Sequence, residues 1–247
     1  MKVTKKIVCF SGGKDSTAML IRVIETDSQI DDILYVGVGD WMWSNAEEHL
    51  KEVEQKLGVK ITRLDAEAEI KKGFERYGFP SLFNRYCTGI KRDTMRDYLR
   101  DKYLTTAEGE SNVQLVQYIG YCSDEERRTD KKIYSAYDVE YPLVEAGITT
   151  EEALQKCYEY GFRFGGVYEH HHHYNCWMCP FQKIDELYYI FKEEPHLWNK
   201  LREMQFNTDG YYNHGESIFE YDKKFWLRNH KELREQRLQA REKYRRK

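Results

Sequence analysis

Residues 11–16 of this 247-residue chain, Ser-Gly-Gly-Lys-Asp-Ser, combine two glycines with a cation, an acid and two hydroxyls. Such residues suit a phosphate-binding loop, because glycines let the backbone approach an anion and the first N–H groups of a helix point toward it. Lys14 adds a positive charge, and Asp15 offers a carboxylate to a magnesium ion that bridges phosphates. We therefore predict that phosphate is bound by Ser11, Gly12, Gly13, Lys14, Asp15 and Ser16. A plain strand-to-helix turn is the alternative.

This loop differs from the two commonest phosphate-binding sequences. In a Walker loop the lysine is followed by Ser or Thr, whereas Asp15 follows Lys14 here, and Val8 stands where the first Walker glycine belongs. The dinucleotide pattern G-x-G-x-x-G is absent as well. The segment therefore indicates phosphate binding of another type.

A second group of reactive residues is Cys176-Trp-Met-Cys179, which is followed by Pro180. Two thiolates three residues apart in a turn are half of a zinc or iron–sulfur site. The remaining ligands must come from elsewhere, and the candidates are Cys87, Cys122 and the histidines at residues 170–173. The alternative is that these cysteines are small buried apolar side chains.

Two basic pairs are candidates for binding an anionic substrate. Lys91 and Arg92 follow Cys87, and Arg127 and Arg128 follow an acidic pair in the middle of the chain. Arginine forms bidentate contacts to sulfate or phosphate, so these four side chains are predicted to bind the substrate's anionic group. A solvated surface is the alternative.

The elements that must position these residues begin with an alternation of strands and helices. The pattern predicts strands at residues 6–10, 32–38 and 59–64, and helices at residues 17–24 and 44–57. The order strand-helix-strand-helix-strand implies a parallel sheet with helical crossovers, so residues 11–16 lie at its carboxyl edge, where α/β proteins bind ligands. Ser44 and Glu47 match a capping box, as do Thr149 and Glu152.

The rest of the chain is less regular. We predict a strand at residues 113–121, helices at residues 91–103, 149–160, 184–191 and 195–204, and a charged helix over the last 25 residues. No repeat or flexible linker interrupts this pattern, which indicates one domain with appendages.

The composition excludes several classes of protein. Hydrophobic residues make up 40% and no run approaches 18 apolar residues, which predicts no membrane span. An aromatic content of 15% argues against disorder. The first ten residues lead directly into a strand without a signal peptide, so we expect a cytoplasmic protein whose six cysteines are thiols or metal ligands.

Charge is distributed unevenly along the chain. Residues 223–247 contain eleven Lys and Arg against three Glu, a net charge of +8, whereas the remaining 222 residues contain 28 basic and 39 acidic groups, a net charge of -11. A basic tail of this kind can bind nucleic acid. A solvated helix end is the alternative.

The hexapeptide at residues 11–16 resembles the PP-loop of the adenine nucleotide α-hydrolase superfamily. The resemblance implies a Rossmann-like α/β fold, a mostly parallel sheet with helices on both faces, and a loop that binds the pyrophosphate end of ATP with Mg²⁺. In that superfamily the nucleotide is cleaved between its α and β phosphates, which makes Lys14 and Asp15 candidate catalytic residues. Asp40 lies in the region where relatives approach the nucleotide.

The cysteines resemble those of assimilatory adenylyl sulfate reductases, in which a Cys-Cys pair and a later Cys-x-x-Cys hold a [4Fe–4S] cluster. Here Tyr86 replaces the first cysteine of the pair, which leaves Cys87, Cys176 and Cys179, with Cys122 as candidate fourth ligand. The sulfur-accepting cysteine that such reductases have near the C-terminus is absent, since no cysteine follows Cys179. Cys87, Cys122 or a partner protein would have to supply that nucleophile, so Cys87 is also a catalytic candidate.

A wider resemblance covers residues 5–205 and includes Gly165-Gly166-Val167-Tyr168-Glu169 and the Asn175–Gln182 segment. It is to the phage and clostridial type of the phosphoadenosine phosphosulfate (PAPS) reductase-like family. On this basis residues 1–205 are expected to form a nucleotide-binding domain that includes the cysteine centre, and residues 206–247 a basic helical extension.

Three functions follow as hypotheses. The first is a PAPS reductase-like enzyme that uses ATP, PAPS or adenylyl sulfate in sulfur transfer. The second is a sulfurtransferase that modifies tRNA or DNA held by the basic tail, and the third is a non-catalytic nucleotide- or metal-binding module. Zn²⁺ or a [4Fe–4S] cluster is the expected metal, and an electron- or sulfur-donor protein is an expected partner. The sequence does not determine the oligomeric state.

Overall fold

The structure of the protein is a computed structural model that describes residues 2–106, 109–110, 112–129, 137–174 and 176–245. The chain divides into two compact units. The first consists of Met1–Ile70 and Tyr86–Cys176, and the second of Lys71–Arg85 and Trp177–Lys247. The predicted extension began at residue 206, whereas here the helices just before that position group with the C-terminal segment.

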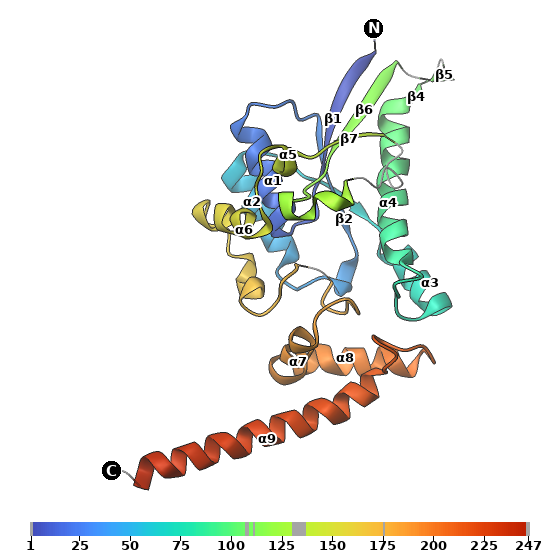
Figure 1. Ribbon diagram of the computed structural model, residues 1–247. Helices are drawn as coiled ribbons and strands as arrows, with labels where there is room; N and C mark the ends of the chain where they lie inside the picture. Colours follow the sequence, from blue (N-terminus) through green and yellow to red (C-terminus); the bar gives the residue numbers. More distant parts are fainter. Residues whose placement is uncertain (1, 107–108, 111, 130–136, 175, 246–247) are drawn as a thin grey trace. The chain divides into compact units, whose positions relative to one another are not determined.

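A five-stranded sheet forms the centre of the first unit (Figure 1). Its strand order is β3-β2-β1-β6-β7, and all four pairings are parallel. The strands are β1 (Val3–Cys9), β2 (Asp32–Gly37), β3 (Thr62–Asp65), β6 (Val113–Tyr118) and β7 (Asp138–Glu140). The predicted parallel sheet is therefore confirmed.

Helices and short turns connect these strands. Four helices of the first unit are α1 (Lys14–Glu25), α2 (Ala46–Leu57), α4 (Tyr86–Leu99) and α6 (Thr150–Glu159). Shorter elements are η1 (Gly39–Trp41), η2 (Arg100–Leu104), β4 (Thr105–Thr106), β5 (Gly109–Glu110), η3 (Ser123–Arg128), α5 (Pro142–Glu145) and η5 (Phe164–Glu169). Helix α3 (Glu67–Tyr77) extends from the first unit into the second.

Helices cover both faces of the sheet. Successive residues of a strand point to opposite faces, so neighbouring residues of β1 pack against different helices. Val8 packs in a cluster with Leu50 of α2 and Ala153 of α6, whereas its neighbour Ile7 packs with Leu99 of α4. Figure 1 shows α1, α2 and α6 on one side of the sheet and α4 on the other. The Rossmann-like arrangement predicted for this chain is therefore confirmed.

Two helix starts differ in how closely they follow the sequence pattern. The box at Thr149 is confirmed, since its hydroxyl accepts from the Glu152 amide and the Glu152 carboxylate accepts from the Thr149 amide at 2.8 Å. The box predicted at Ser44 is wrong, because α2 begins after Asn45 and has no side-chain cap. The Asn45 side chain instead binds residues more than a hundred positions later, as described below.

The second unit contains α7 (Ile184–Glu193), α8 (Pro195–Phe206) and α9 (Ile218–Arg245), the last of which confirms the predicted C-terminal helix. Aromatic rings join the three helices: the ring of Phe225 lies 5.2 Å from that of Tyr188 and 5.6 Å from that of Trp198. Among the described residues, no helix is both long and apolar enough to cross a membrane.

Candidate functional site

The Ser-Gly-Gly-Lys-Asp-Ser loop connects β1 to α1 at the point where the strand order reverses. β1 pairs with β2 on one side and with β6 on the other, so the connections from β1 and from β6 leave the sheet in opposite directions. Such a switch point opens a crevice at the carboxyl ends of the strands, where α/β proteins bind ligands. The loop therefore lies where its sequence predicted.

The connection after β6 packs directly on this loop. A Cβ atom on Gly120 would lie 2.9 Å from the carbonyl oxygen of Asp15 and 3.0 Å from the backbone nitrogen of Ser16. Only a glycine permits so close an approach of two backbones. The two loops at the switch point are thus held against each other at Gly120.

Internal hydrogen bonds fix the shape of the loop. The Ser11 and Ser16 hydroxyls lie 3.0 Å apart, and the Ser16 hydroxyl donates to the Gly13 carbonyl at 3.0 Å. Gly12 has φ of +81°, a conformation that glycine adopts without strain. Gly13 is the N-cap of α1 and leaves that helix start without a side-chain cap. The helix start is therefore suited to an anion.

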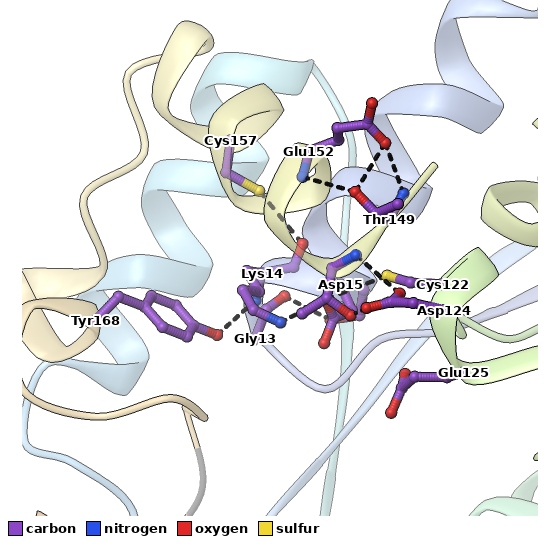
Figure 2. A network of polar contacts seen from close by, with 12 residues as sticks. Gly13, Lys14, Asp15, Cys122, Asp124, Glu125, Thr149, Glu152, Cys157 and Tyr168 are labelled. Atoms are coloured by element: carbon purple, nitrogen blue, oxygen red, sulfur yellow. Dashed lines mark hydrogen bonds and ion pairs between the residues drawn. The ribbon is translucent and has the colours of Figure 1, made fainter. Parts of the chain in front are cut away.

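Tyr168 of η5 contacts the first turn of α1 (Figure 2). Its hydroxyl accepts a hydrogen bond from the Lys14 backbone N–H at 2.7 Å. Tyr174 lies beside the same loop, with Cβ 3.7 Å from the Cβ position of Gly13, and Tyr35 of β2 approaches Gly12 equally closely. Three tyrosines from different parts of the chain thus surround the two glycines.

Lys14 and Asp15 form an ion pair inside the loop (Figure 2). Lys14 is 4% exposed, and its Nζ lies 2.6 Å from Oδ1 of Asp15. The Cys122 thiol, which follows β6, donates to the same carboxylate oxygen at 3.4 Å. Burial, together with the charge of Asp15, raises the pKa of the Cys122 thiol to about 12.

A second buried thiol lies on the other side of this turn. Cys157 of α6 donates to the Lys14 carbonyl oxygen at 3.2 Å. Burial raises the pKa of Cys157 to about 12 as well. Both thiols are therefore hydrogen-bond donors to the loop at neutral pH, and neither is a thiolate there.

His49 of α2 is buried in an aromatic cluster near the loop. Its ring lies 4.6 Å from that of Phe164 and 5.7 Å from that of Tyr174. Among the described residues neither ring nitrogen has a hydrogen-bond partner, and Nδ1 lies 3.7 Å from the Glu52 carboxylate. Burial lowers the pKa of His49, although Glu52 opposes that effect.

Asn45 connects this cluster to the start of α2. Its side-chain oxygen accepts from the Tyr174 hydroxyl at 2.8 Å, and its amide nitrogen donates to the Phe164 carbonyl at 3.0 Å. A Cβ atom on Gly165 would lie 1.9 Å from the Asn45 amide nitrogen, so this contact requires glycine. The aromatic side chains beside the loop are thereby held in place.

Cys87 and Cys176 pack in a different cluster, which includes Val36 of β2 and Leu64 of β3. Both are half-buried there with Met42, whose sulfur lies 3.8 Å from Sγ of Cys176. The Nζ of Lys91 lies 4.0 Å from the same Sγ atom. Burial and the proximity of Cys176 raise the pKa of Cys87, and Lys91 opposes that shift.

The other two cysteines of the expected metal centre have different surroundings. Cys122 packs in the cluster that contains Val8 and Ala153. Cys179 is part of the second unit, where its carbonyl accepts from the Tyr212 hydroxyl at 2.9 Å. In the part of the chain that the structure describes, no group of three His, Cys, Asp or Glu side chains is arranged to hold a metal ion. Zinc and [4Fe–4S] clusters need such a donor set, so the described side chains do not form a site for either.

The predicted anion-binding residues fall into two places. Arg127 and Arg128 end η3, just beyond the β6 loop, and the Arg128 guanidinium stacks 4.1 Å above the Tyr121 ring. Lys91 and Arg92 lie on α4 near Cys176, with Arg92 paired to Asp93 at 3.1 Å. Asp40 is exposed in η1, which follows β2.

Comparison with known proteins finds a family similarity in the first part of the chain. Residues 5–110 match the family model of the phosphoadenosine phosphosulfate reductase domain. These residues are similar to a PAPS reductase domain. The match begins in β1 and includes the loop at residues 11–16, and it supports the nucleotide binding of the PP-loop superfamily, whose PAPS reductase members are generally enzymes.

One relative of this chain is an uncharacterized protein of Methanocaldococcus jannaschii. The two are 28% identical over 211 residues, which are 81% of this chain and 41% of the relative. The chain thus spans about two fifths of the length of that relative.

Proposed function

We propose that this PAPS reductase-like chain is an enzyme that binds ATP or an adenylyl sulfate at residues 11–16. The observation that supports this best is the pair of buried Lys14 with Asp15 at a helix start whose N-cap residue, Gly13, has no capping side chain, on the switch point of the sheet. Backbone N–H groups, a lysine and two hydroxyls lie within one turn there and can bind the phosphates of a nucleotide.

Each residue of the loop has a distinct role in this proposal. Lys14 leaves Asp15 when phosphate binds and pairs with the phosphate oxygens instead. Asp15 is then free to accept Mg²⁺, which typically binds one or two carboxylates together with substrate phosphates. The Ser11 and Ser16 hydroxyls, which bond each other in the structure, donate to the same phosphates.

We propose cleavage between the α and β phosphates as the reaction. With ATP, an acceptor oxygen attacks the α phosphorus, and pyrophosphate leaves with the electron pair of the broken bond. A sulfur donor then displaces AMP from the adenylylated acceptor. Cys87 or Cys176 is the candidate sulfur nucleophile within the chain, since the two lie in one cluster and the Lys91 ammonium lies 4.0 Å from Sγ of Cys176.

Product analysis tests this reaction. Purified protein incubated with ATP, Mg²⁺ and sulfide, with water as the acceptor oxygen, should release AMP and pyrophosphate, and Lys14→Ala should abolish that release. Lys51→Ala removes an exposed lysine of α2 and is the matched control. Formation of ADP and phosphate, or equal AMP formation by Lys14→Ala, would contradict the proposal.

A nucleic-acid acceptor is the second candidate, and the net charge of +8 over residues 223–247 favours it. In that case the sulfur is transferred to a base or phosphate of a polynucleotide. A separate protein that donates sulfur or electrons remains part of both proposals.

A further inference from the structure

The outward side of α9 separates its charges. With about 100° of rotation per residue, Lys223, Lys231, Arg234, Arg237 and Arg241 lie in one half of the helix circumference. The three glutamates that follow Lys223, at positions 232, 235 and 242, lie in the other half, together with the buried core residues Tyr221 and Phe225. We call the half with the five cations the basic face.

Those five cations have no carboxylate partner among the described residues, unlike two other cations of the same helix. Arg228 pairs with Asp185 at 2.7 Å and with Glu232 at 3.2 Å, and Lys224 pairs with Glu216. Arg228 and Lys224 thus have a structural role within the second unit. The charge of the basic face is not neutralised in the same way.

Large apolar side chains alternate with the cations on the basic face. Trp226 and Leu227 are each 55% exposed, and Leu233 and Leu238 are also exposed. The Trp226 indole stacks on the His230 ring at a centroid distance of 3.7 Å, and more than half of the Trp226 surface stays exposed. The basic face therefore offers flat apolar surface and positive charge together.

A groove adjoins this face at the start of α9. It has a volume of about 470 Å³ and lies between α7, α8 and α9, and its lining includes Trp198, Phe219, Lys223 and Trp226. That volume falls within the range of about 300–1,000 Å³ that is usual for small-ligand sites. A flat ring that enters the groove meets aromatic walls, with Lys223 at the edge.

The pattern fits one kind of occupant better than the alternatives. A coiled-coil partner needs apolar residues at both a and d positions, but with Phe219, Trp226 and Leu233 at d, the a positions that follow them are Lys223, His230 and Arg237. A membrane surface needs a continuous apolar half, whereas here cations interrupt it. Single-stranded nucleic acid presents phosphates and unpaired bases in alternation, which matches cations and aromatic rings on one face.

We propose that the basic face of α9 and its groove bind single-stranded nucleic acid. Phosphates pair with the five cations, and a base stacks on Trp226. This binding is independent of the nucleotide loop, because all of its residues belong to the second unit. It would bring a polynucleotide to the protein whether or not ATP is bound.

Fluorescence anisotropy of the full chain with labelled 20-mers of U and of dT tests the proposal over a series of KCl concentrations. Arg241→Gln removes a cation of the basic face, and Lys243→Gln removes an exposed cation two residues away but outside it. Arg241→Gln should weaken binding several-fold and reduce the slope of log affinity against log salt by about 0.7. Lys243→Gln should change neither. Trp226→Ala should weaken binding at least five-fold, as loss of one stacked base would.

Four results would overturn the proposal: no binding at 50 mM KCl, equal effects of Arg241→Gln and Lys243→Gln, unchanged affinity of Trp226→Ala, or displacement of the oligonucleotide by anionic lipid vesicles. Stronger binding of a duplex than of either single strand would also contradict it. Circular dichroism confirms that each variant keeps its helix. Lys14→Ala should bind the oligonucleotides normally, so failure of ATP binding and failure of this proposal can be told apart.

Discussion

The hydroxyl of Tyr168 lies 2.7 Å from the backbone nitrogen of Lys14, although the two residues are 154 positions apart in the chain. This bond satisfies one of the N–H groups at the start of α1 and fixes the phosphate-binding loop to η5. The aromatic cluster around Tyr174 and His49 is connected to the loop through the same contact.

Removal of that hydroxyl should therefore loosen the loop. We expect Tyr168→Phe to lower the free energy of unfolding by about 1 kcal/mol, the usual contribution of one hydrogen bond. Urea unfolding followed by circular dichroism measures the change. Tyr211→Phe, at a largely exposed tyrosine, is the control and should have no effect. Equal stability of the two variants would show that the contact contributes nothing.

Gly120 should tolerate no side chain. Because its Cβ would lie 2.9 Å from the Asp15 carbonyl, Gly120→Ala must push the β6 connection away from the loop. We expect a loss of about 1–3 kcal/mol in stability and weaker ATP binding. Gly89→Ala is the matched control, since nothing lies within 4 Å of its Cβ position on α4, and it should be neutral or stabilising. Normal ATP affinity of Gly120→Ala would contradict the described packing.

Local sequence was sufficient to predict the start of the fold. The order from β1 to β3, the loop at residues 11–16 and the cap at Thr149 all depend on neighbouring residues, and the structure has each of them. Helix α3 and strand β7 were not predicted, since β7 has only three residues and little periodicity. The box at Ser44 failed because Asn45 is used for a contact with Phe164.

The surroundings of the loop could not be predicted in this way. Tyr168, Tyr174, His49 and Gly120 reach it through long-range packing, and no local spacing indicates such contacts. Only the family resemblance drew attention to Tyr168 and to the two glycines before it, and it did not predict their contact with the loop. Likewise, the spacing of Cys176 and Cys179 suggested a shared metal, but it does not reveal which other side chains lie nearby.

Stability should depend on pH through His49. Burial lowers the pKa of His49 in the folded protein below its ordinary value of 6.5, so the unfolded chain binds a proton first as pH falls. The free energy of unfolding should therefore be fully maintained above pH 6.5 and should decrease below it. His49→Phe removes this titration, and the wild-type minus variant difference should shrink between pH 7.5 and 5.5. A difference that stays constant over that range would show that His49 does not titrate differently on folding.

Two thiols beside the loop should be unreactive in the native protein. With a pKa of about 12, Cys122 and Cys157 have roughly a thousandfold less thiolate at pH 8 than an ordinary thiol. Mass spectrometry after brief iodoacetamide treatment should find both unmodified, and both should react once the chain is unfolded in guanidinium chloride. Fast modification of Cys122 in the folded protein would mean that it is exposed or ionised.

The central claim is that residues 11–16 bind an adenine nucleotide through Lys14. Isothermal titration calorimetry with ATP and Mg²⁺ tests it most directly, using wild-type protein, Lys14→Ala and the exposed-lysine control Lys51→Ala. We predict that wild type and Lys51→Ala bind ATP with equal affinity and that Lys14→Ala binds at least ten-fold more weakly, because loss of a charged hydrogen-bond donor costs about 1.5–3 kcal/mol. Equal ATP affinity of wild type and Lys14→Ala, or no binding by the wild type, would contradict the account.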